Sequence, residues 1–480
     1  MKLSTKYYFI LLSTVGVYYV ISKIVFDKIY ETILIVVDEL FHIPQGLTYC
    51  NGNFSHWDPK ITTLPGLYLL SAPIGMYLEC NSYNLRFVNL IASCLNLAIF
   101  SSILKFIYGN NTESQFKIVL QAVNLAILPP LYFFSHVYYT DTLSLTFLLI
   151  YSRLCLNNRS KIFIFIFGLC SVIMRQTNIV WVGMVLGHKL LDILIRSSRV
   201  YGNSYLTRAK VSKRSPIARD IDSSKLKRYY GLYDAFVALK YHVTTSFLTV
   251  SKFVTYQDSC VIMQQCLVLS VFAVFMFING SIVVGDKEAH KPTIHLPQVL
   301  YFLLFYGVFG LPYVIAKLIS TMKLIFSNKL LALLLGIIVA IIVHFNTTVH
   351  PYLLADNRHY VFYIWNRWFG KYDYAIYATI PAYIFLIFSL YDNLKDQNCI
   401  SFLLPYSVCA SVVLGLQKLV DLRYFLVPYI VLRLRFIRPS FRIVVFEFIL
   451  YVLLNIVTLY IFFTKEIIWT DFVEAQRIIW

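Results

Sequence analysis

The chain has 480 residues, of which 59% are hydrophobic and only 14% are charged. Soluble domains carry about 45–50% apolar and about 25% charged residues, so too little polar surface remains here to cover a water-soluble globule. The formal charge of +18 comes from Lys and Arg that lie mostly in short segments between apolar runs. That pattern indicates membrane orientation and not nucleic-acid binding. We therefore predict an all-α polytopic membrane protein.

The first apolar run covers residues 7–25 and follows Lys2 and Lys6. With about 19 residues it is long enough to cross a bilayer. No small-residue cleavage pattern follows it, so we expect a retained helix whose N-terminus is cytosolic. In total we expect about 12 to 14 spans. The others are predicted near 85–108, 116–135, 141–156, 162–174, 178–191, 264–284, 297–319, 329–347, 373–391, 400–418, 420–434 and 443–463.

Cations in short loops predict which loops are cytosolic. Arg153 and Lys161 bracket one such loop, and residues 433–442 carry four arginines in another. The largest hydrophilic segment, residues 191–263, is strongly basic. We expect it to be a cytosolic loop, partly disordered, that rests on anionic lipid.

The same basic segment contains Asp220-Ile221-Asp222. Such a pair can hold a divalent cation on the diphosphate of a nucleotide sugar. Here it lies between Arg219 and Lys225 without a surrounding α/β pattern, so charge balance within a solvated loop is the better interpretation.

With the N-terminus in the cytosol, residues 26–84 form the first lumenal loop. Its apolar part, residues 64–78, contains Pro65 and Pro73 and fits a helix that lies in the membrane interface. Cys50 and Cys80 both fall in this loop, so a disulfide between them is a hypothesis. Further lumenal loops are expected near 136–141, 175–178, 285–296 and 348–372. The side of the C-terminus stays open, because residues 356–372 have room for one short crossing.

Two adjacent acids, Asp38 and Glu39, follow directly on an apolar stretch of the first loop, and His42 lies four residues beyond Asp38. If this segment is helical, Asp38 and His42 share a face. A carboxylate held at the interface can act as a general base toward a sugar hydroxyl. The alternative is an acidic cap or a solvated pair of loop residues.

A second cluster in the first loop contains Trp57, Asp58 and Tyr68. Aromatic rings beside a carboxylate can stack on a sugar and hydrogen-bond to it. An interfacial aromatic belt explains the same residues about as well.

Asp141 and Arg175 lie at the lumenal ends of two predicted spans. Ionisable residues at such positions are costly and are candidates for function. The planar guanidinium suits a phosphate, although a snorkelling anchor is the alternative for Arg175.

Five histidines fall in the predicted lumenal loops, and Arg358 precedes one of them. No HxxxH, HxH or HExxH spacing occurs, so we expect hydrogen-bond donors to phosphate or sugar and no metal site. These histidines are His42, His290, His295, His350 and His359.

Taken together, these segments resemble a known family. Residues 38–45 (DELFHIPQ) and 57–68 (WDPKITTLPGLY) resemble the eukaryotic dolichyl-phosphate-glucose α-1,2-glucosyltransferases. Residues 175–181, 285–298, 350–360 and 421–428 look like further signatures of that family. The matches run in order from about residue 38 to residue 430, and residues 191–263 match no segment that we can name.

The resemblance implies a GT-C glycosyltransferase fold with a catalytic acid in the first lumenal loop, in a monomer of the endoplasmic reticulum membrane whose active site faces the lumen. The implied donor is dolichyl-phosphate-β-glucose, and the acceptor is the dolichyl-pyrophosphate oligosaccharide that already bears two glucoses. Transfer from a β donor to an α product is inversion in one displacement, for which one carboxylate suffices. No cofactor is expected.

Residue roles follow from the resemblance together with charge and position. Asp38 is the expected base, and Glu39 is the second choice. The expected phosphate contacts are Arg175, Arg358 and His359. The expected sugar or acceptor contacts are His42, Trp57, Asp58, Asp141 and His350.

Two other interpretations remain. Another GT-C transferase that uses a dolichol-linked sugar, α-1,3-glucosyl or mannosyl, would share the fold and the mechanism. A transporter or channel-associated protein would spread ionisable residues along several spans, whereas here they gather at one interface.

Overall fold

The computed structural model describes residues 2–108, 114–157, 161–208, 232–245, 253–287, 293–395, 398–417, 419–470, 472 and 474–480. Of these described residues, 77% are helical. In the described residues the only strands are β1 (Glu466–Ile467) and β2 (Gln476–Arg477), which pair antiparallel. The prediction of an all-α protein is confirmed. The Asp220 and Asp222 pair and His290 lie outside the described residues.

Seven stretches of helix in the described residues are long and apolar enough to cross a membrane. Four shorter apolar helices accompany them. The protein is therefore a multi-pass membrane protein, while the total of about 12 to 14 spans stays a prediction. The long helices are α1 (Lys2–Thr32), α4 (Ser82–Tyr108), α9 (Asn178–Arg208), α12 (Tyr256–Asn279), α16 (Lys329–Asn346), α19 with α20 (Ala375–Ala378 and Ile380–Leu394) and α23 (Phe441–Thr464). The shorter ones are α8 (Lys161–Met174), α13 (Pro297–Phe309), α15 (Leu318–Ser327) and α21 (Ile400–Gly415).

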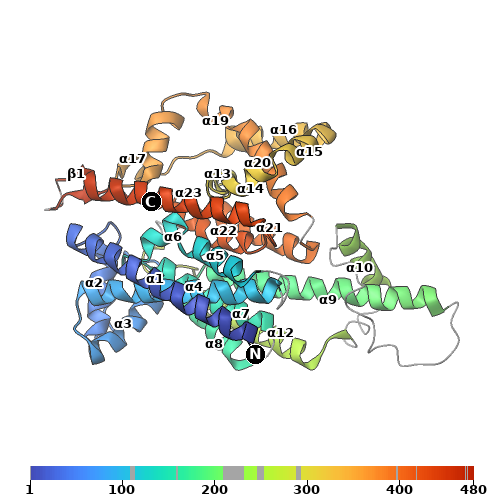
Figure 1. The fold of residues 1–480 in the computed structure, drawn as a ribbon, viewed down its shortest axis with the longest axis horizontal. Helices are drawn as coiled ribbons and strands as arrows, with labels where there is room; N and C mark the ends of the chain where they lie inside the picture. The colour runs from blue at the N-terminus through green and yellow to red at the C-terminus, as the bar shows by residue number, and fades with distance from the viewer. Residues whose placement is uncertain are drawn as a thin grey trace.

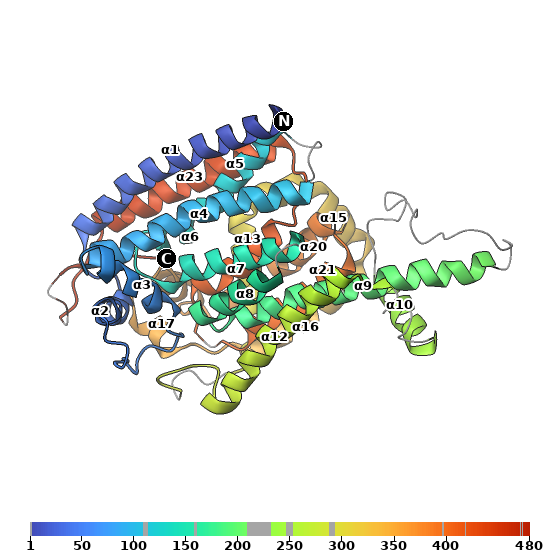
Figure 2. The ribbon, with the colours of Figure 1, turned by 90° about the horizontal axis from the view of Figure 1, so that it is seen from below.

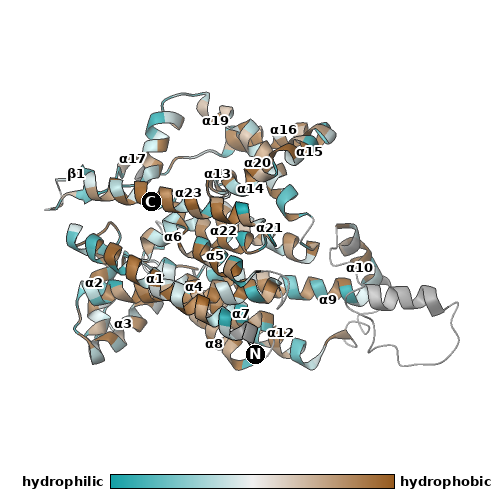
Figure 3. Cartoon of the chain, viewed as in Figure 1, coloured by the Kyte–Doolittle hydropathy of each residue, from teal (hydrophilic) through white to brown (hydrophobic). Residues whose placement is uncertain are grey.

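The helices form two groups that meet in the middle of the molecule (Figure 1). One group contains α1, α4, α7, α8, α9 and α12, and the other contains α13 to α20. Hydrophobic residues run along α4, α16 and α23 (Figure 3). The remaining described helices are α5 (Gln115–Ala126), α6 (Pro129–Phe134), α7 (Thr140–Asn157), α10 (Leu232–Thr245), α14 (Leu311–Ala316), α17 (Pro351–Ala355), α18 (Tyr360–Ile364), the π-helix η1 (Trp365–Phe369), the 3₁₀ helix η2 (Leu422–Phe425) and α22 (Leu426–Arg433).

Helices α1 and α23 run in the same direction, and α5 packs against both (Figure 2). Ile29 in the last turn of α1 and Ile33 just after it share a buried cluster with Phe462 near the end of α23. Residues after α23 therefore emerge at the same end of the molecule as the first loop. The helices described between residues 347 and 374 have only five residues each, too few to cross a bilayer. The sequence left the membrane side of the C-terminal segment undecided. In the structure this segment lies on the same side as the first loop.

The first loop begins later and ends earlier than predicted, because α1 continues to Thr32 and α4 begins at Ser82. It contains α2 (Glu39–Cys50) and α3 (Gly66–Tyr77), and α3 is the helix expected over residues 64–78. The hypothesised disulfide between Cys50 and Cys80 is present. At Gly75 a Cβ atom would lie 2.0 Å from the carbonyl oxygen of Cys50, so only glycine allows α3 to approach the disulfide this closely.

Replacing both Cys50 and Cys80 by Ser is expected to lower the free energy of unfolding by about 2–4 kcal/mol. The bond closes a loop of 30 residues and so restricts the unfolded chain. Thermal unfolding in detergent with and without reductant measures this. Cys94→Ser, at a half-buried free thiol, is the control. Equal unfolding temperatures for the wild type and the double variant would contradict the prediction.

Two expectations about basic segments are wrong in part. Residues 191–263 were expected to be a loop, but α9 extends to Arg208 and projects from the bundle beside α10 (Figure 1), and α12 begins at Tyr256. Amphipathic helix continues there because residues 191–208 contain no Pro and only one Gly. Arg433 was expected to be a loop cation, but it is buried and forms a two-bond ion pair with Glu447 at 2.7 Å.

Candidate active site

The backbone is strained just before the first acid of the loop. Val37 adopts a φ of +38°, an unusual value for a β-branched residue that costs about 1–3 kcal/mol. Tyr139, which precedes α7, holds this conformation: the Asp38 amide donates to its hydroxyl at 2.9 Å, and that hydroxyl donates to the Val36 carbonyl at 3.2 Å. Burial and the charge of Asp38 raise the pKa of the Tyr139 phenol well above its usual range. Tyr139 therefore keeps its proton and fixes where Asp38 points.

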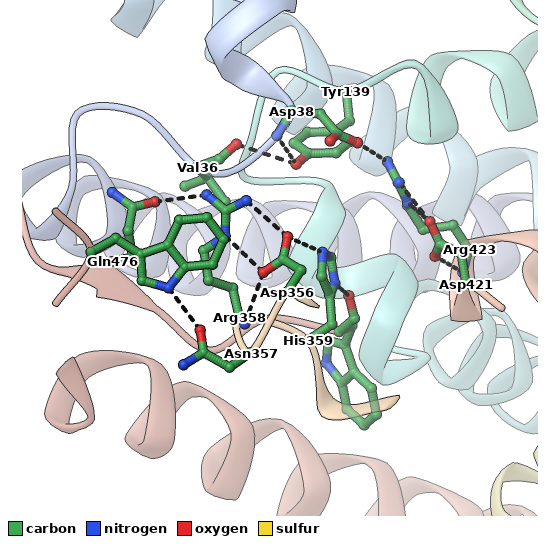
Figure 4. Close-up of polar contacts among 12 residues, drawn as sticks. Val36, Asp38, Tyr139, Asp356, Asn357, Arg358, His359, Asp421, Arg423 and Gln476 are labelled. Carbon is green, nitrogen blue, oxygen red and sulfur yellow. Dashed lines mark hydrogen bonds and ion pairs between the residues drawn. The ribbon is translucent and has the colours of Figure 1, made fainter. Parts of the chain in front are cut away.

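Asp38 faces an arginine from the far end of the chain. Its carboxylate lies 2.9 Å from the Nη1 atom of Arg423, in η2. The other edge of that guanidinium binds Asp421 at 2.5 and 2.7 Å (Figure 4). The Asp38 side chain is 36% exposed, whereas that of Arg423 is 14% exposed. The arrangement presents a reachable carboxylate beside a guanidinium that Asp421 also holds in place.

Glu39 has a different environment. Its carboxylate is fully buried and receives Nε and Nη2 of Arg86 at 2.8 and 2.5 Å. It also accepts from the amides of Val36 and Tyr138 at 2.9 and 2.6 Å. Because every contact is to the protein and no surface is exposed, the geometry disfavours Glu39 as the base. It instead ties the first loop to α4 and to the segment before α7.

The four-residue spacing of Asp38 and His42 does place them together, because α2 starts at Glu39. His42 Nδ1 lies 2.5 Å from the hydroxyl of Tyr68, whose ring packs edge-on against Trp57 at 5.7 Å between centroids. The carboxylate of Asp58 accepts the amide of Lys60 at 2.9 Å and closes a local turn. His42 and Trp57 thus line the site, while Asp58 shapes the loop.

His42 is predicted to make stability depend on pH. Burial lowers its pKa below 6.5; Asp38, Asp141 and Glu39 oppose this effect, and Arg423 reinforces it. Between that lowered pKa and 6.5 the unfolded chain binds more protons than the folded one, so stability falls as pH drops below about 6.5. The loss is at most about 1.4 kcal/mol per pH unit. Unfolding temperatures of wild type and His42→Gln from neutral to mildly acidic pH test this, and parallel curves would refute it.

Asp141 and Arg175 form an ion pair between the start of α7 and the end of α8. The second oxygen of Asp141 is buried and has no hydrogen-bond partner in the described residues. The Arg175 guanidinium lies 5.6 Å from the ring centroid of Tyr424, and Tyr424 directly follows Arg423 in the sequence. The pair therefore adjoins the Asp38–Arg423 pair. Arg175 was predicted to contact a phosphate. In the structure its guanidinium is paired with the Asp141 carboxylate.

Arg358 and His359 lie on the segment between α17 and α18 (Figure 4). Arg358 binds Asp356 through two bonds of 2.8 and 2.9 Å. Burial raises the pKa of Asp356, but the hydrogen bonds from Arg358 outweigh this and lower it overall. Arg358 is buried and stacks at 4.2 Å on Trp469, so a direct phosphate contact is disfavoured for it in this arrangement.

The segment after α23 packs against the backbone of Arg358 and His359. Ile479 forms an isolated parallel β-bridge with His359, and the Ile479 amide donates to the Arg358 carbonyl at 2.7 Å. His359 Nδ1 lies 3.0 Å from the Trp480 carbonyl, so its tautomer donates there. Burial raises the pKa of Asp421, but the charges of Arg423 and, more weakly, His359 lower it overall. His350 lies just before α17.

Sequence reasoning did not select Arg423, Asp421 or Tyr139 as site residues. A signal for Arg423 existed, because a charge interrupts the apolar run 420–434. Its partner in space, Asp38, lies 385 positions earlier, so only folding shows the pairing. Within the described ranges, no group of three or more His, Cys, Asp or Glu side chains is arranged to hold a metal ion.

These helices and side chains define a class: a multi-pass membrane protein with a charged, partly open site at one membrane surface. The family model described as "DIE2/ALG10 family" matches residues 33–434, and the chain belongs to this family. The match covers every residue of the site except those of the C-terminal segment.

Relatives that share one name occur in animals and plants. The chain is 38% identical over 447 residues to the Drosophila melanogaster "Dol-P-Glc:Glc(2)Man(9)GlcNAc(2)-PP-Dol alpha-1,2-glucosyltransferase", with 93% of each chain covered. The Rattus norvegicus protein of that name is 33% identical, with 92% of this chain and 93% of the relative covered. The Arabidopsis thaliana one is 30% identical, with 92% and 94% covered. No solved structure matches the chain.

Proposed function

We propose that this protein transfers glucose from dolichyl-phosphate-β-glucose, in α-1,2 linkage, onto the diglucosylated oligosaccharide carried by dolichyl pyrophosphate. The names of its relatives support the reaction. The observation that carries it is the half-exposed Asp38 carboxylate held 2.9 Å from Arg423 at one end of the bundle. A base and a cation side by side are what a displacement at a sugar phosphate requires.

Asp38 is the proposed general base. It takes the proton from the acceptor 2-hydroxyl while that oxygen forms a bond to C1 of the donor glucose. The C1–O bond to phosphate breaks, and its electron pair leaves with dolichyl phosphate. Attack on the face opposite the phosphate converts the β donor into an α product, and no covalent sugar–enzyme intermediate is needed.

Arg423 is the proposed phosphate contact, together with Arg175. The Arg175 guanidinium lies 5.6 Å from the ring centroid of Tyr424, the residue that follows Arg423. Fixed cations aimed at the developing phosphate charge stabilise the transition state without a proton donor. The reaction proposed here assigns no step to a metal or cofactor. We propose His359 as a further donor to the same phosphate, which requires its Nδ1 to give up the contact with the Trp480 carbonyl.

Trp57 is the proposed platform for the acceptor. It lines a cavity of about 240 Å³ together with Pro65, Val284 and Gly285. Its indole N–H is buried without a hydrogen-bond partner in the described residues. The loop of Gly285 is seated there by its left-handed φ of +69° and by the Asp286 amide, which donates to the Pro59 carbonyl at 2.8 Å. A sugar hydroxyl at the edge of the indole would supply the missing acceptor.

The proposed location is the endoplasmic reticulum membrane, with the site facing the lumen and the chain acting as a monomer. The Cys50–Cys80 disulfide supports an oxidising compartment for the first loop. The N-terminal end of α1 would then face the cytosol.

Replacing Arg423 by Gln is expected to lower kcat about 10²-fold, because one fixed donor to the developing phosphate charge is lost. Arg423→Lys keeps the charge but cannot bridge Asp38 and Asp421, so we expect a smaller loss. Transfer assays with dolichyl-phosphate-glucose measure both variants. Equal kcat for wild type and Arg423→Gln would remove Arg423 from the phosphate site.

The function is tested by profiling lipid-linked oligosaccharides in cells that lack this protein. Accumulation of the two-glucose precursor, corrected by the wild type, is expected. Accumulation of another precursor would assign a different dolichol-sugar transferase step, and an unchanged profile would contradict the transferase function. Purified protein offered dolichyl-phosphate-glucose and dolichyl-phosphate-mannose separately should use only the first.

A further inference from the structure

A second polar cavity lies at the opposite end of the helices that carry the site. It measures about 350 Å³ and lies between the start of α1, the end of α4 and the end of α7. From Tyr8 to Thr32 the helix rises about 36 Å at 1.5 Å per residue, comparable to a bilayer with its interfaces. The cavity therefore lies at the other membrane surface. It is lined by Tyr7, Tyr8, Leu11, Ala98, Ser102, Lys105, Phe106 and Arg153.

Two cations share this cavity. The Lys105 ammonium lies 3.6 Å from the centroid of the Tyr7 ring and 5.1 Å from that of Tyr8. The Arg153 guanidinium packs 4.9 Å from the Phe106 ring and donates through Nε to the Ser102 hydroxyl at 2.9 Å. Aromatic faces and one hydroxyl thus position both charges.

Neither cation has a carboxylate partner in the parts of the chain that the structure describes. The acids of the three lining helices, Asp27, Glu31 and Asp141, are all near their opposite ends. Two like charges in one cavity repel each other, and the described surroundings supply no anion to offset this. The geometry is complementary to an anion with several oxygens.

The neighbouring surface indicates where that anion comes from. Phe9 and Leu12, one turn along α1, are 72% and 75% exposed, as lipid-facing residues are. Tyr8 is 60% exposed and stands between this apolar surface and the cavity. Lys, Arg and Tyr at the membrane–water boundary suit a phosphate whose acyl chains lie along the helices.

We propose that this cavity binds the phosphate of an anionic phospholipid from the leaflet on that side. Lys105 supplies a point charge, and the Nη groups of Arg153 supply paired donors. The lipid would join α1 to α4 and α7 at the end remote from the reaction. This site is independent of the proposed glucosyl transfer.

The test is lipid retention by the full chain purified in detergent and incubated with equal phosphatidylserine and phosphatidylcholine, read by native mass spectrometry. The wild type should retain more phosphatidylserine than phosphatidylcholine. Lys105→Gln with Arg153→Gln should lower that retention about tenfold. The control Lys6→Gln with Lys161→Gln removes the same charge at the same end and should behave as wild type.

Three results would overturn the proposal: undiminished retention by the double variant, equal loss in the control, or displacement of the lipid by inorganic phosphate, which would make free phosphate the ligand. Lys105→Arg with Arg153→Lys keeps both charges and should hold the lipid, which separates loss of binding from loss of folding. Glucosyl transfer measured on the same samples shows that each variant is folded.

Discussion

Asp38→Asn is expected to lower glucosyl transfer by about 10²–10⁴-fold, the usual contribution of a positioned general base. The amide keeps the size of the side chain but cannot accept the hydroxyl proton. Binding of the donor should change little, because Arg423 retains Asp421 as its second partner. The loss should therefore appear in kcat and not in KM. Single-turnover assays with dolichyl-phosphate-glucose measure it.

Asp27→Asn is the matched control for this experiment. Asp27 is a carboxylate of α1 that pairs with Lys23 at 2.6 Å and is 41% exposed, so its amide variant should transfer glucose as the wild type does. An Asp38→Asn protein with near wild-type kcat would remove Asp38 from the mechanism. Since Glu39 is buried, another group would then have to be the base.

Arg86→Met is expected to destabilise the protein by about 3–5 kcal/mol, because it leaves the Glu39 carboxylate buried without its cation. Both side chains of this pair are fully buried. Thermal or denaturant unfolding in detergent measures the loss. It should be accompanied by loss of transfer, because Glu39 is the first residue of α2 and its carboxylate fixes the backbone beside Asp38.

Two comparisons make this prediction specific. Arg86→Met with Glu39→Gln should be more stable than Arg86→Met alone, since no buried charge then remains unpaired. Lys28→Met breaks the exposed pair with Glu31 and should unfold like the wild type. If the double variant is no more stable than Arg86→Met, the ion pair is not what holds the loop.

Much of the site was predictable because its residues are close in sequence. Asp38 and His42 lie four positions apart, and helical spacing alone predicts a shared face. The position of Trp57 near Tyr68 and the joining of Cys50 to Cys80 were also within reach, because one short loop contains them all.

Roles that depend on burial could not be predicted. Asp38 and Glu39 are adjacent acids, and sequence cannot show that one faces Arg423 while the other is enclosed by Arg86. Likewise, Arg358 has the charge that a phosphate contact needs, but Asp356 and Trp469 already occupy its guanidinium.

The sequence by itself determined the class of the protein, the family resemblance and the gathering of polar residues in loops on one side. It does so because a bilayer demands long apolar helices, and membrane crossings alternate the loops between two surfaces. Only the tertiary structure decided which charges meet. Contacts such as those of Asp38 with Arg423 and of His359 with Ile479 join segments far apart in the chain. They arise from how the helices pack, which local pattern does not encode.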